Sequence, residues 1–219
     1  MSTSSTPRTV KSFVLRQGRM TTGQKSALSR LYDTYCLNTE NINTQLKTLT
    51  QPLALEIGFG MGDALLHYAK TYPQMLWLGI EVHAPGVGRV LNEMEKQEIT
   101  NIRIIQDDAV MILKNHIPDH SLERVHLFFP DPWPKARHHK RRIVNAAFIK
   151  LLSLKLQPQG ILHMATDWAN YAEWMREVMI KQNFFRLQSE TRNNRPLTKF
   201  EQRGIKLGHS ITDLCYEKI

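Results

Sequence analysis

Acidic side chains stand at the ends of four successive apolar runs in this sequence of 219 residues. The four residues are Glu56, Glu81, Asp108 and Asp131. In an open α/β sheet the carboxyl ends of parallel strands meet at one edge, where ligands bind. If the four runs are parallel strands, these carboxylates line a single crevice. Their positions therefore predict a binding site rich in negative charge, suited to a ligand that carries positive charge.

A glycine-rich turn, GFGMG at residues 58–62, follows the first apolar run. Glycines let a backbone turn tightly and approach a ligand closely. The nicotinamide fingerprint needs a glycine where Asp63 stands, and no phosphate-binding GxxxxGKS or GxxxxGKT run occurs. Glu56 and Asp63 would repel a diphosphate but favour a sulfonium and an ammonium group. Because Glu81 is also placed to bind a ribose diol, the pattern favours S-adenosylmethionine over NAD or ATP. The alternative is an ordinary tight turn with exposed acids.

The fourth apolar run ends in FFPDPWPK, residues 128–135. Pro130 and Pro132 flank Asp131 and restrict its backbone. A rigidly placed carboxylate beside Trp133 suits the floor of a site for a planar base. The alternative is a stiff turn with Trp133 packed into the core, because tryptophan is usually well buried.

Positive charge exceeds negative charge and is clustered along the chain. There are 29 Lys and Arg against 20 Asp and Glu, which gives a formal net charge of +9. The excess lies in residues 1–32, 135–142 and 192–206. Three separate clusters indicate a polyanionic partner such as nucleic acid. The alternative is a set of solvated basic faces kept for solubility.

Short apolar runs alternate with stretches of helical periodicity after Pro52. This order predicts βαβ units and a doubly wound, mostly parallel sheet. The expected strands are residues 53–57, 75–81, 102–106, 124–129 and 160–166, and the expected helices are 63–72, 85–98, 109–115, 142–156 and 168–182. Residues 184–188 and 210–218 are further candidate strands that would form an antiparallel C-terminal edge. We expect one domain, residues 51–219, after a basic and partly disordered N-terminal arm, residues 1–50, with one helix near residues 23–36.

Other protein classes are disfavoured by what the sequence lacks. No apolar stretch reaches the about eighteen residues of a membrane helix, and the polar N-terminus has no apolar signal segment. Cys36 and Cys215 are too far apart and too few for a disulfide framework, so we expect a reducing cytoplasm. The nine histidines show no ligand spacing, and no metal site is expected.

Five segments together resemble one protein family. They are LEIGFGMGD, GIEVHAPGVG, FPDPWPKARHHKRRI, ATDW and TKFEQRGIKLGH. These motifs are similar to those of the tRNA (guanine-N7)-methyltransferase family, and the similarity extends from Phe13 to the C-terminus. The resemblance implies a class I methyltransferase (Rossmann-like) fold with a seven-stranded sheet and S-adenosylmethionine as cofactor. It also implies methylation of guanine 46 in the variable loop of tRNA. The sequence is compatible with either a monomer or a homodimer.

The resemblance also implies roles by motif position, with Asp131 as the catalytic residue. The implied cofactor-binding residues are Glu56, Gly58, Gly60, Gly62, Glu81, Asp108 and Asp131. The implied substrate-binding residues are Lys135, Asp167, Thr198, Lys199, Phe200 and Glu201. The implied RNA-binding residues are Arg137, His138, His139, Lys140, Arg141 and Arg142.

Guanine N7 carries a free lone pair, so methyl transfer to it needs no general base. The protein must instead place the base, and Asp131 can stabilise the positive charge that develops on the purine. Asp131 and Asp167 can also accept hydrogen bonds from guanine N1–H and the exocyclic amine, which adenine does not offer. The position of Asp167 suits a helix N-cap equally well, and Thr198 with Glu201 has the spacing of a capping box.

Two other functions are compatible with parts of the sequence. A non-catalytic RNA-binding protein on a Rossmann-like scaffold would explain the basic clusters, but it gives no role to Glu56, Glu81 and Asp131. A nicotinamide oxidoreductase is disfavoured by the spacing of the glycines.

Overall fold

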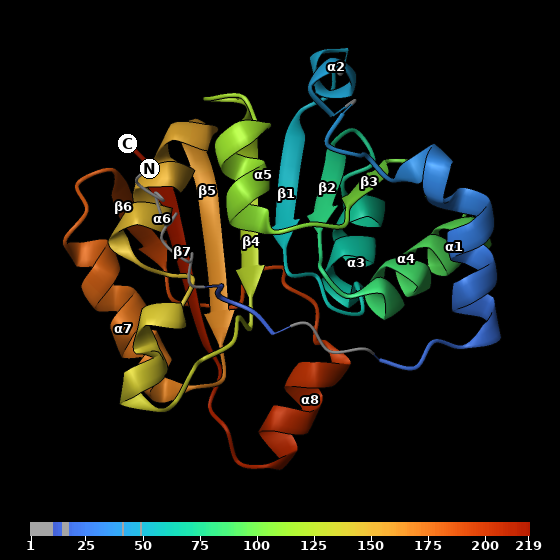
Figure 1. Cartoon of the computed structure of the whole chain (residues 1–219). Coiled ribbons are helices and arrows are strands. Elements are labelled where there is room, and N and C mark those ends of the chain that lie inside the picture. Colours follow the sequence, from blue (N-terminus) through green and yellow to red (C-terminus); the bar gives the residue numbers. More distant parts are fainter. Residues whose placement is uncertain (1–10, 15–17, 41, 49) are drawn as a thin grey trace, which may run out of the picture.

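Seven strands form one sheet, in the order β3-β2-β1-β4-β5-β7-β6 (Figure 1). The computed structural model describes residues 11–14, 18–40, 42–48 and 50–219. Strands β1 to β5 pair in parallel, and β7 pairs antiparallel with both β5 and β6. The predicted seven-stranded, mostly parallel sheet with an antiparallel C-terminal edge is therefore confirmed. The strands are β1 Leu53–Ile57, β2 Leu76–Ile80, β3 Ile102–Ile105, β4 Leu122–Phe128, β5 Leu156–Thr166, β6 Phe185–Ser189 and β7 Thr212–Lys218.

Helices cover both faces of the sheet and create two hydrophobic cores (Figure 1). One face is covered by α1 Thr22–Tyr35, α3 Asp63–Thr71 and α4 Ala84–Lys96. The other face is covered by α5 Ala109–Asn115, α6 Ala146–Lys155 and α7 Ala169–Ile180. The short helix α2 Ile42–Lys47 also packs against this second core through Ile42 and Leu46. All five residues of β1 and of β2 are buried, as expected for parallel strands covered on both faces.

Two predicted boundaries differ from the structure by four residues, and the others differ by at most two. Helix α6 begins at Ala146, four residues after the predicted start, because the Asn145 side chain accepts a hydrogen bond from the backbone N–H of Phe148 (3.1 Å) and caps the helix. Strand β5 begins at Leu156, four residues before the predicted start at residue 160, so the segment PQG at residues 158–160 lies inside the strand. The pairing between β4 and β5 is irregular there, so the chain stays in the sheet through a local irregularity in register.

The helix predicted near residues 23–36 is present as α1 and packs on α4. A Cβ on Gly88 of α4 would lie 2.8 Å from the backbone oxygen of Gln24, so the two helices approach closely. After α1, the N–H of Leu37 donates to the backbone oxygen of Ile104 (2.8 Å) beside β3. Residues 1–10, 15–17, 41 and 49 of the expected N-terminal arm lie outside the described residues. Within the described ranges, no helix has the length and apolar character to cross a membrane.

The remaining helical segments lie near the carboxyl ends of the parallel strands. They are the 3-10 helix η1, Ala136–Arg141, and the helix α8, Lys199–Lys206 (Figure 1). The glycine turn between β1 and α3 lies at the same end, and Gly62 there has a left-handed backbone (φ 77°) that favours glycine. A Cβ on Gly86 of α4 would lie only 2.0 Å from the backbone oxygen of Gly60. Helix α4 therefore sets the position of the glycine turn.

We predict that Gly86→Ala destabilises the protein by about 1–3 kcal/mol, because the added methyl group must displace the backbone of the glycine turn. Urea unfolding monitored by circular dichroism measures the effect. Gly23→Ala is the matched control, since its Cβ would meet its nearest neighbour at an ordinary 3.6 Å. We expect the control to change stability by no more than about 0.5 kcal/mol. Equal effects of the two substitutions would contradict the proposed packing of α4 on the turn.

Candidate functional site

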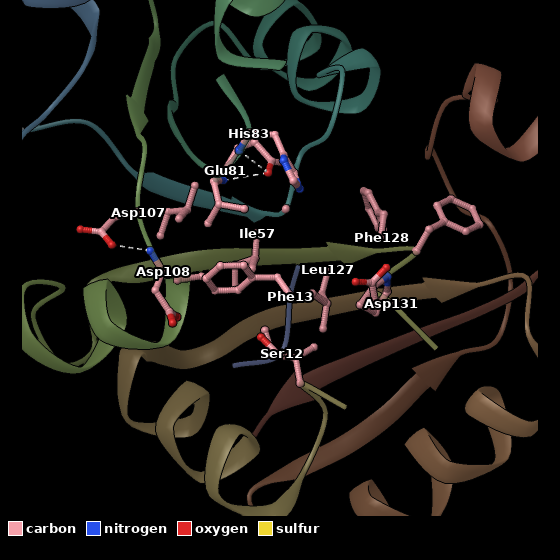
Figure 2. A pocket seen from close by; sticks show the side chains of 17 residues that line it. Ser12, Phe13, Ile57, Glu81, His83, Asp107, Asp108, Leu127, Phe128 and Asp131 are labelled. Carbon is pink, nitrogen blue, oxygen red and sulfur yellow. Dashed lines mark hydrogen bonds between the residues drawn. The ribbon is translucent and has the colours of Figure 1, made fainter. Parts of the chain in front are cut away.

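Two adjacent hollows open at the carboxyl ends of the central parallel strands. The first, of about 190 Å³, lies beside the ends of β1, β2, β3 and β4 (Figure 2). The second, of about 370 Å³, lies between the glycine turn and the N-terminus of α8. Both are lined by Gly58, Phe128 and Phe129, so they are neighbouring parts of one crevice. Glu81, Asp108 and Asp131 line the first hollow and Glu56 lines the second, which confirms that the four predicted carboxylates gather at one crevice.

Glu56 is a buried carboxyl group at the end of β1, with only 3% of its surface exposed. Its Oε2 atom has no hydrogen-bond partner in the part of the chain that the structure describes. Burial, followed by the nearby charges of Asp63 and Glu81, raises the pKa of Glu56 to about 8. A cationic group that reaches Oε2 would stabilise the ionised form of Glu56, because it supplies the missing partner.

The other acids around the glycine turn are already satisfied by the protein. Glu81 accepts hydrogen bonds from the backbone N–H groups of Gly60 (2.8 Å), Val82 (2.7 Å) and His83 (3.0 Å). Asp63 forms an ion pair with Arg89 (2.6 Å), and Arg89 also donates to the backbone oxygen of Met61. Glu81 thus fixes the turn against the end of β2, while Arg89 neutralises Asp63.

Asp108 caps the helix that follows β3. Its Oδ1 atom accepts a hydrogen bond from the N–H of Val110 (2.9 Å) at the start of α5. The neighbouring Asp107 accepts a hydrogen bond from the N–H of Asp108 (2.6 Å). One oxygen of Asp108 is therefore used in capping, and the side chain still lines the first hollow (Figure 2).

Asp131 is exposed and belongs to a strained loop. Phe129 and Trp133, two residues before and two after it, both have left-handed backbone angles (φ 53° and 45°). Such angles cost about 1–3 kcal/mol each for residues other than glycine and often occur at functional sites. Trp133 is half-buried, with its Nε1–H donating to the backbone oxygen of Ser12 (3.0 Å) and the Arg141 guanidinium 3.7 Å from its ring centre. The ring therefore holds the chain near Ser12, and neither sequence interpretation of Trp133 foresaw this role.

Ser12 and Phe13 line the first hollow and were not predicted as site residues. Figure 2 shows Phe13 beside Asp108 and Leu127. Arg141 fixes this segment, since its Nη2 donates to the backbone oxygen of Phe13 (3.1 Å) and its Nε to that of Lys11 (3.1 Å). No local sequence pattern distinguishes Phe13, because its place depends on a contact with a residue 128 positions away.

Three of the four residues of the TKFE segment line the second hollow, namely Thr198, Lys199 and Phe200. The Phe200 ring lies 5.2 Å from that of Phe129, which links α8 to the end of β4. Thr198 caps α8 by accepting a hydrogen bond from the N–H of Glu201 (3.2 Å). The predicted capping box is half correct, because the Glu201 side chain does not return to Thr198.

Glu201 is fully buried and holds α8 in place instead of facing the crevice. Its carboxylate accepts hydrogen bonds from Arg195 (2.7 and 3.1 Å) and from Arg192. Arg195, also buried, donates to both oxygens of Asp213 in β7 (2.7 and 2.8 Å). Burial alone would raise the pKa of Asp213, but the hydrogen bonds from Arg195 and His163 lower it to about 2. Sequence reasoning missed this network, because its members come from three separate segments.

Asp167 follows β5 but is not the N-cap of α7. The capping position is occupied by Trp168, whose N–H donates to Thr166 Oγ1 (3.2 Å). Asp167 Oδ2 lies 3.1 Å from Nδ1 of His209, just after α8. The helix-cap interpretation of Asp167 was wrong, and its carboxylate is tied to the α8 end of the site. Lys135, at the N-cap of η1, is exposed and lines neither hollow.

The predicted RNA-binding residues form η1 and its end, and they differ in exposure. Arg137 and Lys140 are exposed, whereas His138 and His139 are half-buried against Trp133 and Trp174. Loss of hydration and the surrounding cations, Arg137 first, lower the pKa of His138. Outside the masked positions, no group of His, Cys, Asp and Glu is arranged to hold a metal ion.

Arg142 departs from the RNA-binding prediction, since only 2% of its surface is exposed. It donates to the backbone oxygen of Pro132 (2.9 Å) and to Asn170 Oδ1 (2.7 Å). Its guanidinium also lies over the rings of Tyr171 and Trp174. A phosphate cannot reach it without disrupting the loop, so Arg142 has a structural role.

Comparison with known proteins gives consistent matches over most of the chain. The sequence profile of a family described as "Putative methyltransferase" matches residues 50–214. A relative from Shewanella amazonensis, named tRNA (guanine-N(7)-)-methyltransferase, is 50% identical over 97% of this chain and 93% of its own. A relative of the same name from Yersinia enterocolitica is 48% identical over 96% of this chain and 92% of its own.

Solved structures share the fold at much lower sequence identity. The 16S rRNA methyltransferase KamB has a TM-score of 0.58 and 12% identity, over 80% of this chain and 91% of that chain. A putative methyltransferase from Streptococcus mutans, in complex with SAH, has a TM-score of 0.51 and 12% identity, over 82% and 96% of the two chains. These similarities confirm the expected class I methyltransferase fold.

The buried carboxyl group of Glu56 predicts how folding stability depends on pH. Its pKa in the folded protein is about 8, against a usual value of 4.5, so the folded state binds the proton more tightly than the unfolded state. This group's contribution to stability is therefore present below about pH 4.5 and is lost as the pH rises through 8. We expect Glu56→Gln to be more stable than the parent protein at pH 8, and the difference to shrink toward pH 5.

Urea unfolding of both proteins between pH 5 and 8.5, without ligand, measures this difference. Glu40→Gln, at an exposed carboxylate, is the control and should track the parent protein at every pH. Parallel stability curves for the Glu56→Gln and parent proteins would show that Glu56 is not a buried acid with a raised pKa.

Proposed function

Because the chain belongs to the tRNA (guanine-N7)-methyltransferase family, we propose that it transfers a methyl group from S-adenosylmethionine to N7 of guanine 46 in the variable loop of tRNA. The observation that carries the proposal is the buried and unpartnered Oε2 of Glu56, next to a glycine turn whose other acids are already satisfied. This arrangement suits a cofactor that carries positive charge and no phosphate.

The residues of the crevice fit S-adenosylmethionine, which supplies an electrophilic methyl group when it is bound. Glu56 offers an oxygen without a partner to an ammonium group. Glu81 and Asp108 line the neighbouring hollow and keep lone pairs that can accept from hydroxyl groups, since each carboxylate oxygen can accept more than one hydrogen bond. Gly58 and Gly60, both with positive φ and open space where a Cβ would stand, let backbone amides approach a ligand.

Asp131 is the proposed catalytic residue. Guanine N7 has a free lone pair, so no residue is required to remove a proton from it. The Asp131 carboxylate is exposed to the crevice and held between two residues of unusual backbone conformation. A negative charge fixed in this way stabilises the positive charge that develops on the purine without reorganising during the reaction.

The remaining proposed roles follow the position of each side chain. Thr198, Lys199 and Phe200 bind the substrate beside the second hollow. Asp167, after β5, and Lys135, at the N-cap of η1, contact the nucleotide. Glu201 supports this site from within by holding α8. The exposed Arg137 and Lys140, together with His138, contact RNA.

We further propose that residues 51–219 form the methyltransferase domain and that the protein acts in the cytoplasm as a monomer or homodimer. Cys36 and Cys215 are buried free thiols, and burial raises the pKa of both, which suits a reducing compartment. No metal takes part in the proposed reaction.

Incubation with labelled S-adenosylmethionine and unmodified tRNA tests the function, and the expected product is 7-methylguanine at position 46. We predict that Asp131→Asn lowers the rate of transfer at saturating tRNA by about 100-fold or more, while the Kd for tRNA stays within about twofold of the parent value. The exposed Asp33→Asn on α1 is the control and should retain full activity. A tRNA with adenine at position 46 should not be methylated.

Methylation at another site would contradict the substrate assignment. Absence of any product, together with absence of binding heat for S-adenosylmethionine in calorimetry, would favour the non-catalytic RNA-binding protein.

Cofactor binding should release a proton from Glu56. At pH 7 this carboxyl group, with its pKa of about 8, is mostly protonated, and an ammonium group favours its ionised form. We expect the affinity for S-adenosylhomocysteine to rise between pH 6 and 8, and the heat of binding at pH 7 to differ between phosphate and Tris buffers. Glu56→Gln should remove the buffer dependence and weaken binding about 10- to 100-fold, as expected for loss of one charged hydrogen bond. Equal heats in both buffers for the parent protein would contradict the role of Glu56.

A further inference from the structure

A third hollow, a groove of about 940 Å³, runs between α5 and α6 on the opposite face of the sheet from α3 and α4. Its walls include Met111 and Lys114 of α5 and Lys150 and Leu154 of α6. One end of the groove is lined by Ser12, Asp107, Asp108 and Ile143, which also line the first hollow of the crevice. The groove therefore leads directly away from the proposed methyl-transfer site.

The groove carries uncompensated positive charge. Four exposed lysines line it, and none of them forms an ion pair with a carboxylate of the described residues. They are Lys11, Lys114, Lys140 and Lys150. Asp119, at the far end, is already neutralised by Lys155 (2.7 Å), while Asp107 and Asp108 lie at the end shared with the crevice. Unpaired cations gathered in a groove attract a polyanion.

These lysines come from four different parts of the sequence, and only Lys140 belongs to the predicted RNA-binding loop. Lys114 lies in the last turn of α5 and Lys150 in the middle of α6, both outside the three basic clusters of the sequence. The two helices place them along one groove that begins beside the η1 loop. Helix α6 has 10 residues and is thus about 15 Å long, enough to follow two or three consecutive phosphates.

From this arrangement we propose that the α5–α6 groove binds the sugar-phosphate backbone of tRNA next to the target nucleotide, and that Lys114 and Lys150 contact its phosphates. This inference rests on the proposed function and adds an RNA-binding surface to it. The occupant is the same RNA whose guanine enters the crevice, because the groove and the crevice share one end. The lysines give affinity without base preference, since phosphates carry no sequence information.

The test compares the double variant Lys114→Ala, Lys150→Ala with the parent protein and with Lys70→Ala, Lys96→Ala. The control pair lies on α3 and α4, on the other face of the sheet, and removes the same number of charges. The Kd for unmodified tRNA is measured at several KCl concentrations between 50 and 200 mM. All four side chains lie on the protein surface, and thermal unfolding verifies that each variant is folded.

We expect the groove variant to bind tRNA more weakly than the parent at low salt and to show a salt slope shallower by about 1 for each lysine. Between 50 and 200 mM KCl it should therefore lose roughly tenfold less affinity than the parent does. Its affinity for S-adenosylhomocysteine and its rate of 7-methylguanine formation at saturating tRNA should be unchanged. The control pair should keep the salt slope of the parent.

An unchanged slope in the groove variant, with 7-methylguanine still formed, would overturn the inference and leave the proposed function intact. An equal loss of slope in the control pair would also overturn it, because the effect would then depend on net charge alone. If the groove variant instead changes the mass measured by sedimentation, the groove is an interface between two copies of the chain and the inference fails. Failure of the parent protein to form 7-methylguanine would overturn the proposed function itself.

Discussion

The buried carboxyl group of Glu56 is the constraint on which the rest of the crevice depends. An acid at the end of a fully buried strand is unfavourable unless a partner compensates it, and here the protein supplies none for Oε2 among the described residues. The surrounding acids do have partners, since Glu81 accepts hydrogen bonds from three backbone amides and Asp63 is paired with Arg89. The crevice therefore presents one carboxyl oxygen without a partner in a wall whose other acids are satisfied. A cationic ligand favours the ionised form of this group, so the crevice selects for the charge of its ligand as well as for its shape.

The opposite wall of the crevice is held by a second set of buried charges. Arg195 joins Glu201 of α8 to Asp213 of β7 and lies over the rings of Phe128 and Phe129. A fully hydrogen-bonded network of this kind fixes geometry more reliably than it adds stability. Through this network, the start of β7 positions both the substrate-facing residues of α8 and the strained loop of Asp131. The two sides of the crevice thus differ, because Glu56 keeps one oxygen without a partner whereas Arg195, Glu201 and Asp213 are fully paired with one another.

Local patterns in the sequence were sufficient to predict the sheet, the glycine turn and the gathering of four carboxylates. Strand β1 has the predicted bounds, because a short apolar run directly before glycines is compatible with few structures other than a buried strand. The failures concern residues whose role depends on distant contacts. Phe13 is placed at the crevice by Arg141 and by the contact of Trp133 with Ser12, and Asp167 is paired with His209 of a later segment. Arg142 is buried by Asn170, Tyr171 and Trp174, all from α7. No spacing rule contains such information, since these contacts exist only once the helices have packed.

The contacts of Arg141 and Arg142 within the protein change how the basic stretch at residues 135–142 should be interpreted. Arginine has a planar fork of donors, which suits it to carbonyl oxygens and aromatic faces. The Arg141 guanidinium donates to backbone oxygens near Phe13 and lies over the ring of Trp133. The Arg142 guanidinium donates to Pro132 and Asn170. Lys140 is left exposed, as are Lys114 and Lys150 in the α5–α6 groove. Lysine is a flexible and strongly hydrated point charge, suited to phosphates that are held less rigidly than a protein carbonyl. Arg141 and Arg142 build the loop, and Arg137 and the lysines around it carry the charge that an RNA backbone meets. A cluster of cations in sequence therefore overstates the number available for RNA, while the fold recruits others from helices that show no cluster at all.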